Sequence, residues 1–186
     1  VSLPPSPPAE ERQLARDWRL FIAATFLFGF GFAVYNGVFQ NFIREVLRAG
    51  PKQLGLVESL REVPGLLTAL LAGTLVALAE SRVAAVGLAI AGIGIAATGV
   101  AGSIPSLILI SVFWSIGFHV FSTVQSAITL ALARGREGGR HLGKMAAVGA
   151  SSTIAGLGAA LLVRSFFPRL AYPVYFFAAG ALILAA

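Results

Sequence analysis

Six long apolar runs, separated by short polar or proline-containing breaks, dominate this chain of 186 residues. They cover residues 20–43, 54–78, 83–101, 107–133, 142–163 and 170–186. An α-helix needs about 20 apolar residues to cross the roughly 30 Å hydrocarbon core of a bilayer, and each run is close to that length. Hydrophobic residues make up 57% of the chain and charged residues only 12%, too few to cover the surface of a water-soluble domain. The sequence therefore predicts an all-α, polytopic membrane protein with six transmembrane helices.

The first 18 residues differ from the rest of the chain. Residues 1–8 contain four prolines, which predicts a disordered tail, and residues 9–18 predict a short surface helix. The tail lacks the basic start and cleavage site of a signal peptide, so the first apolar run is expected to stay in the membrane. Residues 19–186 then form the six-helix bundle. Because the chain starts with Val1 and stops inside an apolar run, we expect it to be part of a longer product.

Lysine and arginine residues set the expected orientation. Eight lie in the tail and in the second and fourth breaks, against five in the first and fifth breaks. The positive-inside rule therefore predicts a cytoplasmic N-terminus in the plasma or inner membrane. These residues flank apolar runs and form no basic patch interleaved with aromatics, so no nucleic-acid partner is expected. The chain has no cysteine and no phosphate-binding Gly-rich Lys motif, and we expect neither a metal site nor a cofactor.

A short sequence occurs twice. Residues 31–38 read Gly-Phe-Ala-Val-Tyr-Asn-Gly-Val, and residues 117–124 read Gly-Phe-His-Val-Phe-Ser-Thr-Val. The two copies lie in the first and the fourth apolar runs. Shared glycine, phenylalanine and valine composition is one explanation. The other is a duplicated unit of three helices, which predicts a 3+3 inverted repeat.

Polar and small residues indicate which helices line an interior, because a polar side chain in lipid needs a protein partner or a water-filled cavity. Runs one, two, four and five each carry one polar or small face at helical spacing. The longest face, in run four, consists of Ser111, Ser115, His119, Ser122, Ser126 and Thr129. The face of run five consists of Gly149, Ser152, Gly156 and Ala160, which favour close helix packing. We expect helices 1 and 4 against each other at the centre, and helices 3 and 6 at the periphery.

The second run contains three charged residues. Glu58, Arg61 and Glu62 lie about 6 to 12 Å inside its start at ~1.5 Å per residue. A charge at the bilayer centre costs at least ~2.5 kcal/mol on insertion scales, so these side chains are expected to face the bundle interior and to pair. Because helices 1 and 2 run antiparallel, Asn36 and Gln40 are expected at the same depth.

Two interpretations of these charges stay open. One is an interfacial salt-bridge group that caps the outer end of the bundle. The other is a site in which Arg61 pairs with one carboxylate, while the second binds a cation, a proton or a charged substrate group. Glu62 lies deepest and is the candidate coupling residue. His119, in the fourth run, is either a proton site or a neutral hydrogen-bond donor.

The chain resembles the N-terminal six-helix half of a major facilitator superfamily transporter. The resemblance is carried by the repeated Gly-Phe-x-Val segment, by Glu-Ser-Leu-Arg-Glu-Val-Pro-Gly over residues 58–65, and by the break between runs two and three. It covers about residues 18–186 and implies two such halves, each a 3+3 inverted repeat, around one midplane site. In the superfamily this break usually reads Gly, three residues, Asp-Arg, then Gly and basic residues. Here Glu80 and Arg82 stand for the acidic and basic members of that gating loop, and the second Gly and its basic partners are missing.

The expected function is secondary active transport of a small solute by alternating access, with the proton as the candidate coupling ion, and no enzyme activity. The resemblance and the polar faces together predict a substrate or ion cavity lined by Asn36, Gln40, Glu58, Arg61, Glu62, Ser115, His119 and Ser122. Its expected partners are the lipid bilayer, the solute, H⁺ and a second six-helix half, encoded downstream or supplied by another copy.

A six-helix intramembrane enzyme and a channel subunit are the alternatives. Ser115 and His119 share one helix, but the flanking glycines of a serine nucleophile and a histidine on a later helix are absent. No filter motif is evident.

Overall fold

The structure, a computed structural model, describes residues 9–75, 80–135 and 137–186, with the side chains of residues 69–75 outside the description. The tail over residues 1–8 lies outside the described residues. The described part contains six α-helices, one short 3₁₀-helix and no strand. The helices are α1 (Ala9–Glu45), α2 (Pro51–Leu75), α3 (Glu80–Ala97), η1 (Thr98–Val100), α4 (Ile104–Ala133), α5 (Gly138–Phe166) and α6 (Tyr172–Leu184). The all-α prediction is therefore confirmed for these residues.

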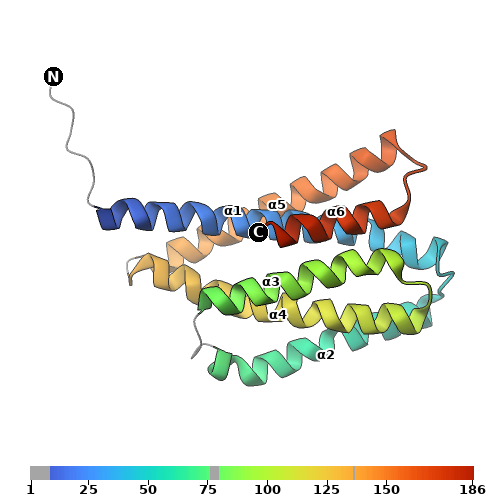
Figure 1. Cartoon of the computed structure of the whole chain (residues 1–186), viewed down its shortest axis with the longest axis horizontal. Helices are drawn as coiled ribbons and strands as arrows, with labels where there is room; N and C mark the ends of the chain where they lie inside the picture. The colour runs from blue at the N-terminus through green and yellow to red at the C-terminus, as the bar shows by residue number, and fades with distance from the viewer. Residues whose placement is uncertain (1–8, 76–79, 136) are drawn as a thin grey trace.

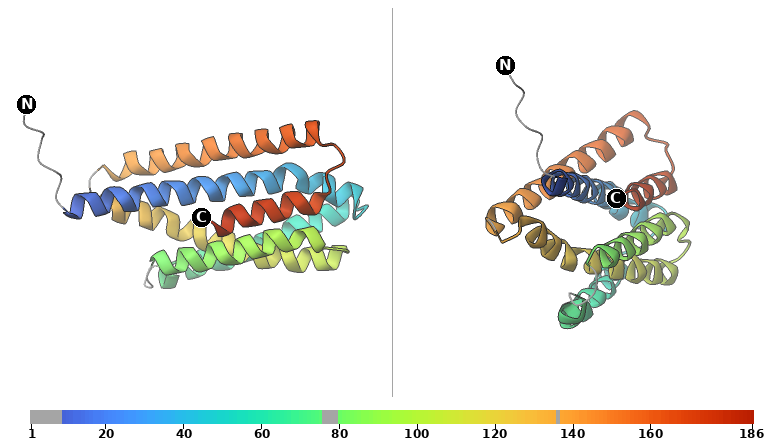
Figure 2. Two further views of the ribbon diagram at one scale, coloured as in Figure 1. Left: turned by 45° about the horizontal axis from the view of Figure 1, so that its top comes forward. Right: turned by 60° about the vertical axis from the view of Figure 1, so that its left-hand side comes forward.

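The helices lie along one long axis (Figure 1). We call the end that carries the start of α1 the near end, and the end that carries Glu45 the far end. α1 lies between α5 and α6, and α4 lies between α2 and α3, while α3 and α6 pack against each other (Figures 1 and 2). The expected central position of helices 1 and 4 is consistent with this arrangement.

Four of the described helices are long and apolar enough to cross a membrane: α1, α3 with η1, α4 and α5. The other two fall short for different physical reasons. Every 18-residue stretch of α2 contains Glu58, Arg61 and Glu62, and α6 is an apolar helix of only 13 residues. The six predicted runs thus correspond to six helices, of which four meet the requirement by length and composition.

The first helix is longer than expected. The surface helix predicted over residues 9–18 is helical, but it continues without a break into the first apolar run, and α1 has 37 residues. At ~1.5 Å per residue α1 spans about 55 Å, well beyond a hydrocarbon core of about 30 Å. Its first turns contact the α4–α5 connection, because Trp18 stacks on His141 at 4.7 Å between ring centroids and Glu10 lies 3.9 Å from Arg134.

Helix ends in the described chain follow local sequence signals. α4 begins at a capping box, in which the Ser103 hydroxyl accepts from the Ser106 backbone at 3.3 Å and the Ser106 hydroxyl accepts from the Ser103 backbone at 3.1 Å. α4 ends at Arg134 and Gly135, both with positive φ. Pro173 occupies the first turn of α6, where its missing N–H leaves no helical bond unmade.

Glycines allow the closest backbone approaches. A Cβ atom on Gly117 of α4 would lie 2.5 Å from the Ala91 nitrogen of α3. Likewise, a Cβ on Gly180 of α6 would lie 2.5 Å from the Gly92 oxygen of α3. Only glycine fits at these crossings.

The small face of α5 packs closely on a neighbouring helix, as predicted, and that helix is α1. Ser152, Gly156 and Ala160 are buried, and a Cβ on Gly156 would lie 2.5 Å from the Phe30 oxygen and 2.7 Å from the Ala33 Cβ. Gly149, the fourth member of the face, is half-buried.

α1 and α4 meet mainly through aromatic side chains, since their backbones approach each other at few positions. Phe32 and Phe118 stack at 4.7 Å between ring centroids. Phe28 packs on Phe121 at 4.6 Å, and Tyr35 packs on Trp114 at 5.2 Å. The predicted contact between helices 1 and 4 is therefore present, but it is an aromatic layer instead of a close backbone crossing.

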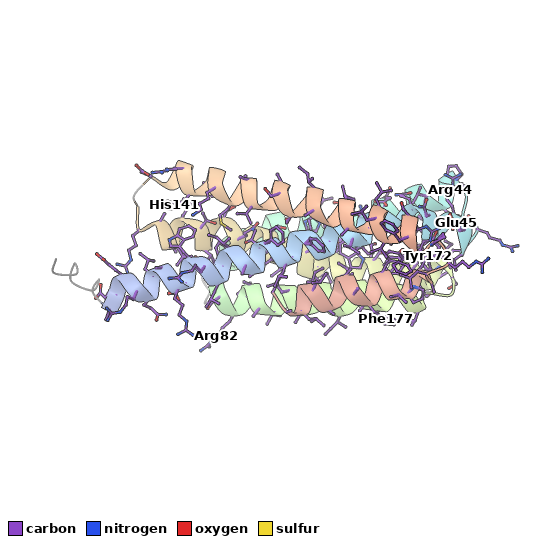
Figure 3. All side chains as sticks on the ribbon, turned by 90° about the horizontal axis from the view of Figure 1, so that it is seen from above. Arg44, Glu45, Arg82, His141, Tyr172 and Phe177 are labelled. Carbon is purple, nitrogen blue, oxygen red and sulfur yellow. The ribbon has the colours of Figure 1, made fainter. Side chains whose placement is uncertain are left out.

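Three helix ends are tied together at the far end, where Figure 3 shows Glu45 and Tyr172 close together. The Tyr172 hydroxyl donates to Glu45 Oε2 at 2.5 Å, and Arg164 Nη2 donates to the same carboxylate oxygen at 3.2 Å and to the Tyr172 hydroxyl at 2.8 Å. This network joins α1, α5 and α6.

Gly117→Ala should destabilise the protein, because the added methyl group forces α3 away from α4. Overpacking of this kind costs about 1–3 kcal/mol, more than the roughly 1 kcal/mol that alanine gains over glycine in a helix. The measurement is the apparent Tm in detergent. Gly158→Ala is the matched control, since a Cβ at Gly158 of α5 meets no atom within 4 Å. Equal Tm values for the two variants would show that the α3–α4 crossing is not close-packed.

Candidate functional site

The second helix carries the charged residues of the site. α2 starts at Pro51, and Gly50 donates its backbone N–H to Gln53 Oε1 at 2.9 Å. Glu58, Arg61 and Glu62 follow within two turns, and the buried Pro64 comes one turn later. Proline has no N–H to donate to the carbonyl four residues earlier, so the helix beside these charges lacks one backbone hydrogen bond.

Arg61 is enclosed by opposite charge and by an aromatic ring. One nitrogen, Nη2, pairs closely with Glu58 Oε2, and Nε lies 3.3 Å from Glu62 Oε1. The guanidinium carbon stands 5.5 Å from the centroid of the Trp114 ring, a cation–π arrangement. With only 17% of its side chain exposed, Arg61 has little surface left for another ligand.

Glu62 is the open member of this group. Its side chain is 60% exposed, and its second oxygen, Oε2, lies 3.7 Å from His119 Nε2. His119 comes from α4 and is held against α2, because a Cβ on Gly65 would lie 2.6 Å from its ring. Glu58, Arg61, Glu62 and His119 form what we call the charged cluster.

A cavity of about 310 Å³ adjoins the charged cluster. It lies between α1, α2 and α4. Its lining consists of Phe32, Asn36, Arg61, Glu62, Trp114, Ser115, Phe118 and His119. Five of the eight predicted cavity residues are therefore gathered here: Asn36, Arg61, Glu62, Ser115 and His119.

The other predicted cavity residues lie beside this cavity or away from it. Gln40 Nε2 donates to Glu58 Oε1 at 3.5 Å, which confirms that helices 1 and 2 bring these side chains to the same depth. Ser122 is half-buried one turn further along α4 and does not line the cavity. Arg82 is exposed near the start of α3, at the near end (Figure 3), and with Glu80 it remains a predicted gating loop.

The polar face of α4 divides into separate environments. Ser111 is fully buried, while Ser115 donates to the Arg61 carbonyl at 2.5 Å. Towards the near end, Ser126 and Thr129 border a second cavity of about 240 Å³ between α4 and α5. Neighbouring helices cover this face at several points, so the two cavities border different parts of it.

Three aromatic residues of the cavity were not among the predicted site residues: Phe32, Trp114 and Phe118. Phe32 and Phe118 are the phenylalanines that both copies of the repeated segment share. This repeat was the sequence signal that could have identified them as site residues. For Trp114, the only available sequence signal was a tryptophan next to the polar face of the fourth run. Among the described residues, no group of three acidic or histidine side chains is placed to hold a metal ion.

Arg61→Met should lower the free energy of unfolding by about 2 kcal/mol, because Glu58 then lies partly buried without its cation. Arg61→Met combined with Glu58→Gln should recover much of this loss. A double-mutant cycle in detergent, with unfolding followed by chemical denaturation, measures the coupling. Additive losses would mean that the two side chains are not energetically paired.

Comparison with protein-family models finds no match for this chain, and comparison with curated proteins finds none either.

Proposed function

We propose that this chain is one six-helix half of a secondary transporter that works by alternating access, as its resemblance to the major facilitator superfamily implies. The charged cluster is the observation that carries this function. It lies within α2, against apolar membrane-compatible helices, and Glu62 is exposed to the cavity. Ionisable groups at such a position are expensive in lipid and typically mark a solute or ion pathway.

The aromatic layer supports a duplicated three-helix unit. The offset that separates Gly31 from Gly117 also relates Phe28 to Trp114, and Tyr35 to Phe121. The contact of Phe28 with Phe121 is matched by that of Trp114 with Tyr35. In a two-fold repeat, a residue near the symmetry axis contacts the equivalent residue of the other unit. The same offset makes Phe32 equivalent to Phe118, and these two rings stack on each other. Shared composition alone does not account for matched contacts.

Helix packing supports the same duplication. Gly65 of α2 faces His119 of α4, and Gly156 of α5 faces Ala33 of α1, the position that corresponds to His119. α1 packs on α5 and α6, whereas α4 packs on α2 and α3. Exchanging helices 1, 2 and 3 for 4, 5 and 6 reproduces this pattern, so we propose that all six helices cross the membrane as a 3+3 inverted repeat.

The working unit is proposed to contain a second six-helix half. Four polar side chains, Asn36, Gln40, Glu62 and Ser126, are exposed on α1, α2 and α4. Each polar group left in lipid without a partner costs several kcal/mol. A second half, from the same product or another copy, would cover this side and enclose the solute.

The rival functions gain no specific support. Ser115 donates its hydroxyl hydrogen to the Arg61 carbonyl, so Ser115 is not aligned on His119 for nucleophilic attack. The basic residues favour a cytoplasmic near end in the plasma or inner membrane.

Alternating access predicts that a labelling reagent reaches two cysteines, one introduced on α1 and one on α4, from opposite sides of the membrane. Gln40→Cys should react with a water-soluble maleimide from outside and Ser126→Cys from the cytoplasm. Changing the pH should shift the ratio of the two rates on the order of tenfold, which a two-state shift of about 1.4 kcal/mol produces. The ratio cancels the thiol's own pH dependence, and the natural chain has no cysteine that would interfere.

Ile93→Cys, on the exposed apolar side of α3, is the control and should not react. Labelling of both test cysteines from the same side at every pH would contradict alternating access.

Glu62→Gln should abolish this pH-dependent shift, because it removes the open carboxylate and keeps the side-chain shape. Glu58→Gln should leave most of the shift in place, since Glu58 faces Arg61 and Gln40. Both variants are compared in the Gln40→Cys and Ser126→Cys chains. A normal shift in Glu62→Gln would move the coupling role to His119.

A further inference from the structure

We propose that the cavity beside Glu62 binds a monovalent organic cation with an apolar, preferably aromatic, body. Because it names the substrate class of the proposed transporter, this inference rests on that function. Three features of the described site carry it: the charge of the cluster, the engagement of Arg61, and the aromatic wall.

With His119 neutral, the charged cluster carries one net negative charge. It contains two carboxylates and one guanidinium, and His119 adds a positive charge only when protonated. Glu58 pairs most closely with Arg61, while Glu62 reaches the same guanidinium with one oxygen at 3.3 Å. Once a second half covers this side, a carboxylate without a full counter-charge needs a proton or another cation.

An anionic substrate finds no comparable partner. Among the described residues, Arg61 is the only arginine or lysine that lines the cavity, and its guanidinium is already occupied by two carboxylates and the Trp114 ring. A second anion would have to displace one of these contacts. The charge balance therefore selects against carboxylate, phosphate or sulfate groups.

The aromatic lining of the cavity attracts cations of low hydration. Phe32, Trp114 and Phe118 line the cavity, and the Phe32 and Phe118 rings lie stacked. Aromatic faces bind ammonium groups through their quadrupole, more strongly when both partners are desolvated. Asn36, also in the lining, offers a polar contact near the open side.

The size of the cavity limits the ligand to a small molecule. Its volume of about 310 Å³ lies at the lower end of the range for ligand pockets, roughly 300–1,000 Å³. Such a space accommodates one ring and one substituted ammonium group, with the ammonium against Glu62 and the ring against the aromatic wall.

Binding is tested directly in lipid nanodiscs by tryptophan fluorescence. The chain has two tryptophans, so Trp18→Phe leaves Trp114 of the cavity as the sole reporter. The probes are phenyltrimethylammonium and benzenesulfonate, which have similar shapes and opposite charges. Phenyltrimethylammonium should change Trp114 emission saturably, and benzenesulfonate should not.

Glu62→Gln should weaken phenyltrimethylammonium binding about tenfold or more, because it removes the unmatched charge. Glu137→Gln is the matched control: Glu137 also pairs with an arginine, Arg140 at 2.7 Å, but lies in the α4–α5 connection. It should leave binding unchanged. If Glu62→Gln does not fold, protection of Asn36→Cys from maleimide by phenyltrimethylammonium, and not by benzenesulfonate, decides the question.

Preference for benzenesulfonate, equal binding of both probes, or binding of neither overturns the inference. None of these readouts requires transport. If phenyltrimethylammonium binds at Glu62 while the Gln40→Cys and Ser126→Cys labelling does not alternate, the cation site stands and the transport function fails. If the labelling alternates but phenyltrimethylammonium does not bind, the transport function stands and the cation site fails.

Discussion

The stacked rings of Phe32 and Phe118 form the contact on which the rest of the bundle depends, because they join the helices around which both three-helix groups are built. α1 is packed by α5 and α6, and α4 by α2 and α3. The aromatic layer connects these groups, together with the α3–α6 crossing, the packing of α4 on α5 and the hydrogen bond from Gln125 to Thr25. Apolar surface gives little driving force between helices in lipid, so large, shape-matched rings supply the association through dispersion and edge-to-face contacts.

The same layer sets the environment of the charges. Trp114 contacts Phe32 and Tyr35 on one side and the Arg61 guanidinium on the other. The aromatic wall thereby removes water from one side of Arg61 and strengthens its attraction to Glu58. Glu62, on the open side, keeps access to the cavity. Arg61 is thus held by Glu58 and Trp114, while Glu62 reaches the same guanidinium with one oxygen and approaches His119 with the other.

Sequence patterns predicted the helices and part of the site, and the physical reasons for the remainder differ. Apolar periodicity locates all six helices, and the small face of α5 indicates its close packing. Helical spacing shows which residues share a face, but it does not show which part of that face a neighbouring helix covers. Ser122 shares the polar face of α4 and was therefore predicted to line the cavity, which it does not. The Glu45–Arg164–Tyr172 network joins residues far apart in the sequence, and no local pattern signals such a contact. Nor does composition show that α1 continues unbroken from Ala9.

The position of α2 follows from tertiary contacts more than from its own hydropathy. Its three charges keep it below the apolarity that the four membrane-compatible helices reach. Inserted alone, it would bear a cost of about 2.5 kcal/mol or more for each charge near the bilayer centre. Packing on α4 lowers that cost, since Trp114, Ser115 and His119 contact Arg61 and Glu62. If α2 crosses the membrane as proposed, it depends on α4 for its stability there, so a change of charge at Glu62 acts directly on the contact between α2 and α4.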